Sequence, residues 1–169
     1  MTKQFAAPVK IKFWLLGLAA AGVLLLVLGP AKTAPDLALT TITGKQVALR
    51  QLRGKVTLVT FWATDCPSCL AEIPDLIDLY RRYHERGLEI IAIAMNYDPP
   101  SRVVALSKNQ SIPYDVVLDL KSDYAQAFGQ VRLTPSTFLI DAKGALAAEQ
   151  TGQFEPEAMK AKISQLLKG

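Results

Sequence analysis

Residues 56–74 read VTLVTFWATDCPSCLAEIP, and this stretch decides the fold. Its first seven residues, Val56–Trp62, are mostly apolar, β-branched or aromatic, which is typical of a strand buried on both faces. Residues 67–86 then carry apolar side chains at positions 70, 73, 76, 77, 80 and 83, a spacing that predicts a helix. Gly87 is placed to end that helix. Cys66 and Cys69, the only cysteines of the chain, therefore lie where a buried strand meets a helix.

Further strands and helices alternate around this stretch. Residues 88–95 (LEIIAIAM) predict a second buried strand, and residues 141–144 (DAKG) predict a hairpin turn. The alternation predicts an α/β fold with a mixed central sheet covered by helices. The other expected strands are 37–43, 46–49, 114–118, 136–140 and 145–150, and the other expected helices are 99–110, 122–128 and 155–168.

A long apolar run precedes the domain. Residues 11–29 contain a single charged side chain, Lys12, and eighteen helical residues would span about 27 Å, close to the hydrocarbon core of a bilayer. We therefore expect one transmembrane helix at 11–29 and a cytoplasmic segment at 1–10, because lysines precede the run. A linker at 30–36 would lead to the exported domain at 37–169. A cleaved signal peptide is the alternative, and both interpretations export the domain.

The charge balance excludes some partners. The chain has 19 Lys and Arg against 15 Asp and Glu, a formal charge of +4. Lys3, Lys10, Lys12 and Lys32 account for the excess, since residues 33–169 hold 15 charges of each sign. The exported domain therefore lacks the basic run that binds nucleic acid. With 50% hydrophobic residues the chain is unlike a disordered protein, and two cysteines are too few for a disulfide-stapled scaffold.

The spacing of Cys66 and Cys69 predicts redox chemistry. On a first helical turn this spacing brings two sulfurs within reach of a reversible disulfide. We expect Cys66 at the helix start, where unpaired backbone N–H groups favour its thiolate, and Cys69 facing inward. Cys66 would then attack a partner's disulfide, and Cys69 would resolve the mixed disulfide.

Other uses of the two sulfurs compete with this one. A structural zinc site needs about four ligands, whereas the chain offers two cysteines and one histidine, His84, which we expect to be solvated. An inert structural disulfide is a second alternative, and copper binding through the two thiolates is a third. We expect neither a metal site nor an organic cofactor.

Three stretches together resemble a known family. Residues 61–74 (FWATDCPSCLAEIP) resemble the active-site region of membrane-anchored thioredoxin-like proteins of the TlpA and ResA type, and of the thioredoxins of cytochrome c maturation. Residues 34–55 are similar to that family's N-terminal hairpin, and residues 133–144 (LTPSTFLIDAKG) to its cis-proline strand and hairpin. The resemblance covers roughly residues 34–168. It implies a thioredoxin-like fold and thiol–disulfide exchange.

The resemblance also implies partners and a place in the cell. The protein would be tethered to a bacterial cytoplasmic membrane, with its domain on the periplasmic or extracellular side. Its dithiol would reduce disulfides of exported clients such as apocytochrome c or copper-centre proteins. A membrane electron donor of the CcdA or DsbD type would then recharge it.

Individual site residues also take roles from the resemblance. It implies that Pro135 is cis and that the backbone of Thr134 faces the dithiol, where it would pair with an extended client. Glu72 occupies the family's place for a buried acid, which would transfer a proton to or from the second cysteine; an exposed first-turn glutamate is the alternative. Trp62 is expected in the wall of the site and in contact with the client.

One position departs from the family. Asp65 stands directly before the first cysteine, where the family commonly has Trp. We expect this carboxylate to cap the helix that follows, although a carboxylate facing the sulfur would disfavour the thiolate. The departure puts in doubt any docking surface or redox potential carried over from the family.

Two other functions compete with disulfide reduction. A peroxiredoxin-like peroxidase usually carries a Pro-x-x-x-Thr-x-x-Cys pattern, whereas here Thr64 lies only two residues before the cysteine and no proline precedes it at that spacing. A copper-delivery module would use the same two cysteines, but no Met-rich or His-rich stretch supports it.

Overall fold

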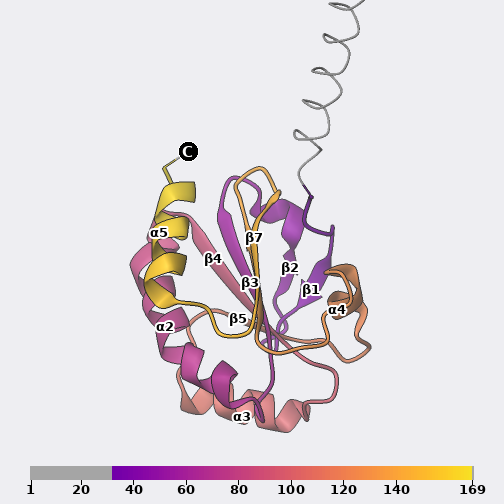
Figure 1. The fold of residues 1–169 in the computed structure, drawn as a ribbon. Coiled ribbons are helices and arrows are strands. Elements are labelled where there is room, and N and C mark those ends of the chain that lie inside the picture. Colours follow the sequence, from indigo (N-terminus) through magenta and orange to yellow (C-terminus); the bar gives the residue numbers. More distant parts are fainter. Residues whose placement is uncertain (1–31, 169) are drawn as a thin grey trace, which may run out of the picture. The chain divides into compact units, whose positions relative to one another are not determined.

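The computed structural model describes residues 32–168 (Figure 1). The predicted cytoplasmic segment 1–10, the predicted transmembrane helix 11–29 and the first two residues of the predicted linker lie outside the described residues. Within residues 32–168, no helix combines the length and hydrophobicity needed to cross a bilayer. The strands are β1 (Ala38–Thr40), β2 (Gln46–Ala48), β3 (Val56–Trp62), β4 (Leu88–Ala94), β5 (Asp115–Leu118), β6 (Ser136–Ile140) and β7 (Leu146–Thr151). The helices are α2 (Pro67–Tyr83), α3 (Pro100–Asn109), α4 (Asp123–Ala127) and α5 (Pro156–Leu166), with short 3₁₀ helices η1 (Leu49–Leu52) and η2 (His84–Arg86).

The main sheet is mixed, as predicted. Its strand order is β5-β4-β3-β6-β7, with β3, β4 and β5 parallel to one another and β6 and β7 antiparallel to their neighbours. β3 lies in the middle, and all seven of its residues are buried. β1 and β2 form a separate hairpin, which touches β5 through a bridge between Thr41 and Val117.

A hydrophobic core lies on each face of the sheet, because successive strand residues point to opposite faces. On one face Leu58 and Ile90 pack with α2 and α5, and Ile163 of α5 is fully buried there. On the other face Phe61 and Ile93 pack with the β1–β2 hairpin, η1 and α4. Figure 1 shows α2 and α5 together on one side of the sheet and α4 with the hairpin on the other. Because both faces of β3 are packed against a hydrophobic core, the strand is held in place. The position at which the cysteine motif begins is therefore held in place as well.

Two opposite ends of this domain matter for function. The parallel strands β3, β4 and β5 all finish at one end, and β6 begins there, since Ser136 pairs with Phe61. We call this the dithiol end, because Cys66 and Cys69 directly follow β3. The seven residues of β3, at roughly 3.3 Å each, place the other end about 23 Å away.

The other end is where the described chain joins the fold. We call it the linker end and define it by segments 32–36, 50–55 and 141–145. Residues 32–36, predicted as linker, are already part of the fold there. The carbonyl of Lys32 accepts a hydrogen bond from Leu146 N (2.8 Å), and Ala34 N donates to the carbonyl of Gly144 (2.9 Å). Residues 32–36 therefore belong to the described domain and are not a linker outside it.

Helix α2 departs from its predicted form in two ways. It ends at Tyr83, and a 3₁₀ turn follows before Gly87, whose φ of 100° ends the element as predicted. The buried stripe also differs: Leu70, predicted to face inward, is 36% exposed, whereas Glu72 is buried. A pattern of apolar residues alone does not reveal a buried acid.

Candidate active site

The two cysteines form a disulfide at the start of α2. The Cα atoms of Cys66 and Cys69 lie 5.2 Å apart, within the ordinary range for a disulfide. Cys66 is the N-cap residue of α2, and its Sγ accepts a hydrogen bond from the backbone N–H of Cys69 at 3.2 Å. Cys66 is half-buried, whereas Cys69 is only 3% exposed. A partner's sulfur therefore reaches Cys66 first, and the N–H at the helix start would favour its thiolate after reduction.

Asp65 does not cap this helix, which makes the sequence-based prediction wrong. The N-cap position belongs to Cys66, and the sulfur of Cys66 already accepts the N–H of Cys69 that a capping oxygen would take. Asp65 is exposed one residue earlier. Its carboxylate therefore adds negative charge to the surface beside the disulfide.

The peptide bond between Thr134 and Pro135 is cis, as the resemblance implies. Pro135 directly precedes β6, whose first residue, Ser136, pairs with Phe61 near the end of β3. This register places the bond at the dithiol end, beside the strand that leads into the motif. Thr134 is half-buried, and Leu133 before it is 66% exposed. A backbone with an exposed apolar side chain thus lies within the reach of a docking polypeptide.

Glu72 is buried, so the alternative of an exposed first-turn glutamate is wrong. Its side chain is 1% exposed, and its Oε1 accepts a hydrogen bond of 2.7 Å from the backbone N–H of Phe154, in the loop between β7 and α5. Burial raises the pKa of Glu72 to about 7; the Phe154 N–H acts in the opposite direction, and the charge of Asp75 raises the pKa further. A carboxyl group with this pKa can take up and release a proton near neutrality. Glu72 therefore has the property that a proton carrier for Cys69 requires.

A small cavity joins Glu72 to the buried sulfur. It measures about 10 Å³, and Trp62, Cys69, Glu72 and Tyr114 are among the side chains that line it. Trp62 lies in the wall of the site, as predicted, but it is only 4% exposed, so in this oxidised structure it presents little surface to a client. Burial, with the charge of Glu72 adding to it, raises the pKa of the Tyr114 hydroxyl. Tyr114 thus stays neutral behind the dithiol.

Asp98 is the site residue that the sequence does not reveal. It is 4% exposed, and its carboxylate accepts hydrogen bonds from the backbone N–H and the hydroxyl of Thr64, two residues before Cys66. The sequence predicts only a turn at Asp98, Pro99 and Pro100. The sequence offers one signal for Asp98, which is its position just after the strand β4. Because β3 and β4 are parallel, residues that follow either strand lie at the same end of the sheet.

The histidine does not join the two cysteines. His84 follows the last residue of α2, about 22 Å along the helix from Cys69 at roughly 1.5 Å per residue. His84 is also less solvated than we predicted, because its ring stacks on Tyr80 with 4.4 Å between ring centroids and its side chain is only 36% exposed. His84 is therefore too far from Cys66 and Cys69 for the three residues to bind one zinc ion. Nowhere in residues 32–168 do three His, Cys, Asp or Glu side chains form a group that could hold a metal ion.

Known proteins are similar to this chain over most of its length. The Redoxin family model matches residues 30–167. The thiol–disulfide oxidoreductase ResA of Geobacillus thermodenitrificans is 33% identical over 128 residues, which are 76% of this chain and 72% of that protein. This chain belongs to the ResA-like redoxins. The ResA of Halalkalibacterium halodurans is also 33% identical, over 135 residues that cover 80% of this chain and 75% of that protein.

A solved structure supports the same assignment for the fold. A thiol:disulfide interchange protein of the thioredoxin family from Chlorobium tepidum TLS superposes with a TM-score of 0.76 at 28% identity, covering 82% of this chain and 98% of that one. The ResA-like protein therefore has the predicted thioredoxin-like fold. It is a thiol–disulfide oxidoreductase whose disulfide joins Cys66 and Cys69.

Proposed function

We propose that this ResA-like protein reduces disulfides in exported polypeptides. The Cys66 thiolate of the reduced protein attacks one sulfur of the client's disulfide, and the client's other sulfur leaves as a thiolate. The Cys69 thiol then transfers its proton to Glu72 and attacks the sulfur of Cys66. This step releases the client sulfur that was bonded to Cys66 as a thiolate, and it forms the disulfide seen in the structure. Two electrons pass from the dithiol to the client.

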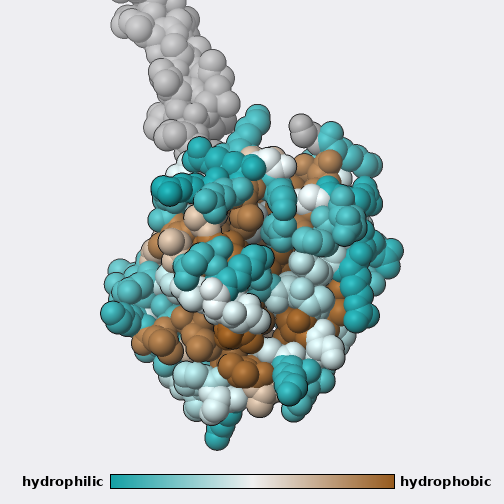
Figure 2. All heavy atoms as spheres, turned by 180° about the vertical axis from the view of Figure 1, so that it is seen from behind, coloured by the Kyte–Doolittle hydropathy of each residue, from teal (hydrophilic) through white to brown (hydrophobic). Residues whose placement is uncertain are grey.

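The arrangement at the dithiol end carries this proposal, because one reachable sulfur lies at the same end of the sheet as several exposed apolar side chains. Leu70, Tyr97, Leu120 and Leu133 are 36%, 53%, 65% and 66% exposed, and each follows the carboxyl end of a parallel strand or precedes β6. Figure 2 shows hydrophobic side chains gathered on the lower part of one face of the domain. Exposed apolar patches of this kind mark protein contacts. An extended polypeptide with apolar side chains beside its disulfide fits such a surface.

A membrane tether is the second part of the proposal. The apolar run at 11–29 and the lysines before it support an anchor with the domain outside the cytoplasm. Tethering raises the effective concentration of the dithiol near clients and donors at the same membrane. We place apocytochrome c or copper-centre proteins among the clients, and a membrane protein of the CcdA or DsbD type as the electron donor.

Trapping in the native host tests the client step. A Cys69→Ser variant forms the mixed disulfide through Cys66 but cannot resolve it, so clients remain bound and are identified by mass. Cys66→Ser is the matched control and is expected to trap none. Recovery of exported haem-binding or copper-binding proteins supports the proposal. Trapping by Cys66→Ser alone would show that the attacking cysteine is wrongly assigned.

The direction of electron flow has its own test. Equilibration of the protein with glutathione mixtures gives the reduction potential of the Cys66–Cys69 pair. If the protein is a reductant, the reduction potential of this pair should be well below that of strong thiol oxidants, which is about −120 mV. A value close to that one would contradict the reductive proposal and leave the fold and the dithiol assignment intact.

A further inference from the structure

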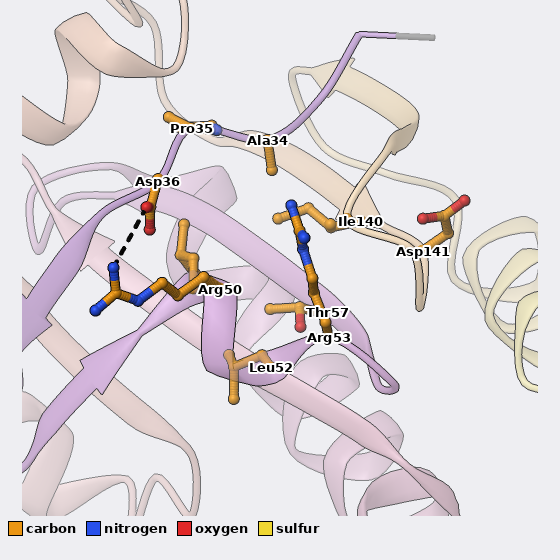
Figure 3. A pocket seen from close by; sticks show the side chains of 11 residues that line it. Ala34, Pro35, Asp36, Arg50, Leu52, Arg53, Thr57, Ile140 and Asp141 are labelled. Carbon is orange, nitrogen blue, oxygen red and sulfur yellow. Dashed lines mark ion pairs between the residues drawn. The ribbon is translucent and has the colours of Figure 1, made fainter.

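A second cavity, of about 190 Å³, lies at the linker end, away from the cysteines (Figure 3). Segment 34–36, the η1 region and the β6–β7 turn form its walls. Backbone hydrogen bonds hold these walls together: Ala34 N donates to the carbonyl of Gly144 at 2.9 Å, and Gly54 N donates to the carbonyl of Ala142 at 2.8 Å. The cavity is therefore built into the fold at the point where the described chain begins.

Two arginines supply the charge of this cavity. In Figure 3 the side chain of Arg53 stands between the segment at Ala34 and the η1 region, whereas Arg50 lies at the rim. Arg50 pairs with Asp36 at 3.8 Å, but both side chains are about two-thirds exposed, so the pair is weak. It is the one ion pair among the eleven residues drawn, and Arg53 has no carboxylate partner there. Both guanidinium groups are thus available to an anion.

The remaining acid of the cavity is already engaged. Asp141 accepts hydrogen bonds from Lys143 N (2.9 Å) and Ala145 N (2.8 Å), which close the β6–β7 turn. In Figure 3 its side chain points away from Arg53. Asp141 therefore does little to offset the charge of the arginines. The remaining lining is mostly apolar, with Leu49, Leu52 and Ile140 beside the hydroxyl-bearing Thr57.

The linker end is basic in an otherwise balanced domain. Its three segments contain five basic residues and two acidic ones, a balance of 5 − 2 = +3. Residues 32–168 as a whole carry 16 basic and 15 acidic residues, so the rest of the described chain is at 11 − 13 = −2. The positive charge is thus concentrated at one end. Its basic members are Lys32, Arg50, Arg53, Lys55 and Lys143, of which Lys55 is paired with Glu89 at 2.6 Å.

The length of the chain brings this end to a bilayer. Lys32 follows Gly29, at the end of the apolar run, by three positions, and three residue steps reach at most about 11 Å. If the run crosses the membrane, the linker end cannot lie far from the lipid headgroups. A guanidinium group binds phosphate oxygens in a bidentate manner, and cations are attracted to an anionic bilayer within about one Debye length.

We propose that the linker end docks on anionic phospholipid, with Arg50 and Arg53 binding the phosphate of a lipid headgroup. The proposal rests on the membrane tether proposed above. Docking in this orientation turns Cys66 and Cys69 away from the bilayer, because the dithiol end lies at the opposite end of β3. The domain would then be held upright rather than free to rotate on its linker.

Hydrogen–deuterium exchange of the full chain in nanodiscs tests the proposal. Each arginine near an anionic bilayer contributes roughly fivefold to binding. We therefore expect amide exchange in segments 50–55 and 141–145 to slow at least about fivefold in phosphatidylglycerol discs relative to phosphatidylcholine discs. The effect should vanish at about 1 M salt, where the Debye length is near 3 Å. Peptides around Cys66 should exchange equally in both discs.

Matched variants separate binding from folding. Arg50→Gln with Arg53→Gln should abolish the lipid-dependent protection, whereas Arg102→Gln with Lys108→Gln, which removes the same charge from α3, should preserve it. Melting temperatures establish that both variants fold. Equal exchange in the two kinds of disc, or unchanged protection in the Arg50 and Arg53 variant, would overturn the proposal. So would full protection of the same segments by inorganic phosphate in phosphatidylcholine discs, which would identify a site for free phosphate.

The same experiment distinguishes an error in the proposed membrane anchor from an error in the proposed lipid docking. If the full chain does not incorporate into discs of either kind, the anchoring proposed above is wrong. Flotation of the chain with vesicles of the same two compositions then decides the docking proposal: selective flotation with phosphatidylglycerol supports it, and absence of flotation with both overturns it.

Discussion

The carboxylate of Asp98 accepts two hydrogen bonds of 2.6 Å from Thr64, one from its backbone N–H and one from its hydroxyl. Asp98 belongs to the loop after β4, and Thr64 to the turn that connects β3 with the cysteine motif. The same turn is closed by Cys66 N, which donates to the carbonyl of Ala63 at 3.2 Å. Asp98 thus fixes the backbone from which Cys66 projects, so we regard it as a positioning residue.

Replacing Asp98 should destabilise the fold and disturb the motif. Asp98→Ala leaves the partly buried Thr64 N–H without an acceptor and should lower the free energy of unfolding by about 2–3 kcal/mol, since hydrogen bonds to charged groups contribute this much. Asp98→Asn keeps one acceptor and should cost about 1 kcal/mol. Denaturant unfolding measures both. Asp78→Ala, at a mostly exposed ion pair with Arg82, is the control and should change stability by under about 0.5 kcal/mol.

The burial of Glu72 makes stability depend on pH. Its folded-state pKa of about 7 lies above its ordinary value of 4.5, so its contribution is complete below about pH 4.5 and is lost as the pH rises through 7. The free energy of unfolding should fall by about 3 kcal/mol over that interval through this group alone. Glu72→Gln cannot ionise and should therefore gain stability relative to the natural protein as the pH rises from about 5 to about 8.

Denaturant unfolding of the oxidised protein at several pH values measures this difference. Glu85→Gln, at an exposed position, is the control and should follow the natural protein at every pH. A constant difference between Glu72→Gln and the natural protein would show that Glu72 is already ionised throughout the range.

The two reduced cysteines should differ in reactivity. Cys66 is half-buried at the surface and Cys69 is 3% exposed, so an alkylating reagent should modify Cys66 at least about tenfold faster. Mass spectrometry of peptides after short reaction times reads out both sites. Equal rates, or faster reaction of Cys69, would contradict the assignment of Cys66 as the attacking sulfur.

Leu133 should matter for polypeptide clients and not for small disulfides. It is 66% exposed beside the cis Thr134–Pro135 bond, and covering a leucine contributes about 1.5 kcal/mol, or roughly tenfold. Leu133→Ser should therefore lower kcat/KM about tenfold for a disulfide-containing polypeptide, with little change for a small aromatic disulfide. Leu167→Ser, at a partly exposed apolar residue beside Gly87 at the opposite end of the sheet, is the control. Equal losses with both substrates would indicate damage to the dithiol rather than to docking.

Much of the fold follows from the sequence because its signals are local. Val56–Trp62 forms a strand as predicted, since a run of apolar and β-branched residues bounded by turn signals leaves little choice. The order of strands and helices is also as predicted. Residues 32–36 are different: they look like a linker, but they belong to the fold through backbone hydrogen bonds to residues more than 100 positions away, which no local pattern reveals.

The site divides in the same way. Cys66, Cys69 and the cis Pro135 are found from the motif and the resemblance, and the structure places them at one end of the sheet. Asp98 lies more than thirty residues from Thr64 and resembles an ordinary turn residue until the two strands are paired. The prediction for Asp65 was wrong because the N-cap residue is Cys66, whose sulfur accepts the backbone hydrogen bond that a side-chain oxygen usually accepts.

Burial of Cys69 has a kinetic consequence. Because only one sulfur meets solvent, the electron donor and the client must occupy the same spot in turn, and neither can bind while the other is covalently attached. Turnover should then follow a ping-pong pattern in which an excess of either partner inhibits the other. The rate of disulfide reduction in the cell would depend on the ratio of the two partners as much as on the amount of enzyme.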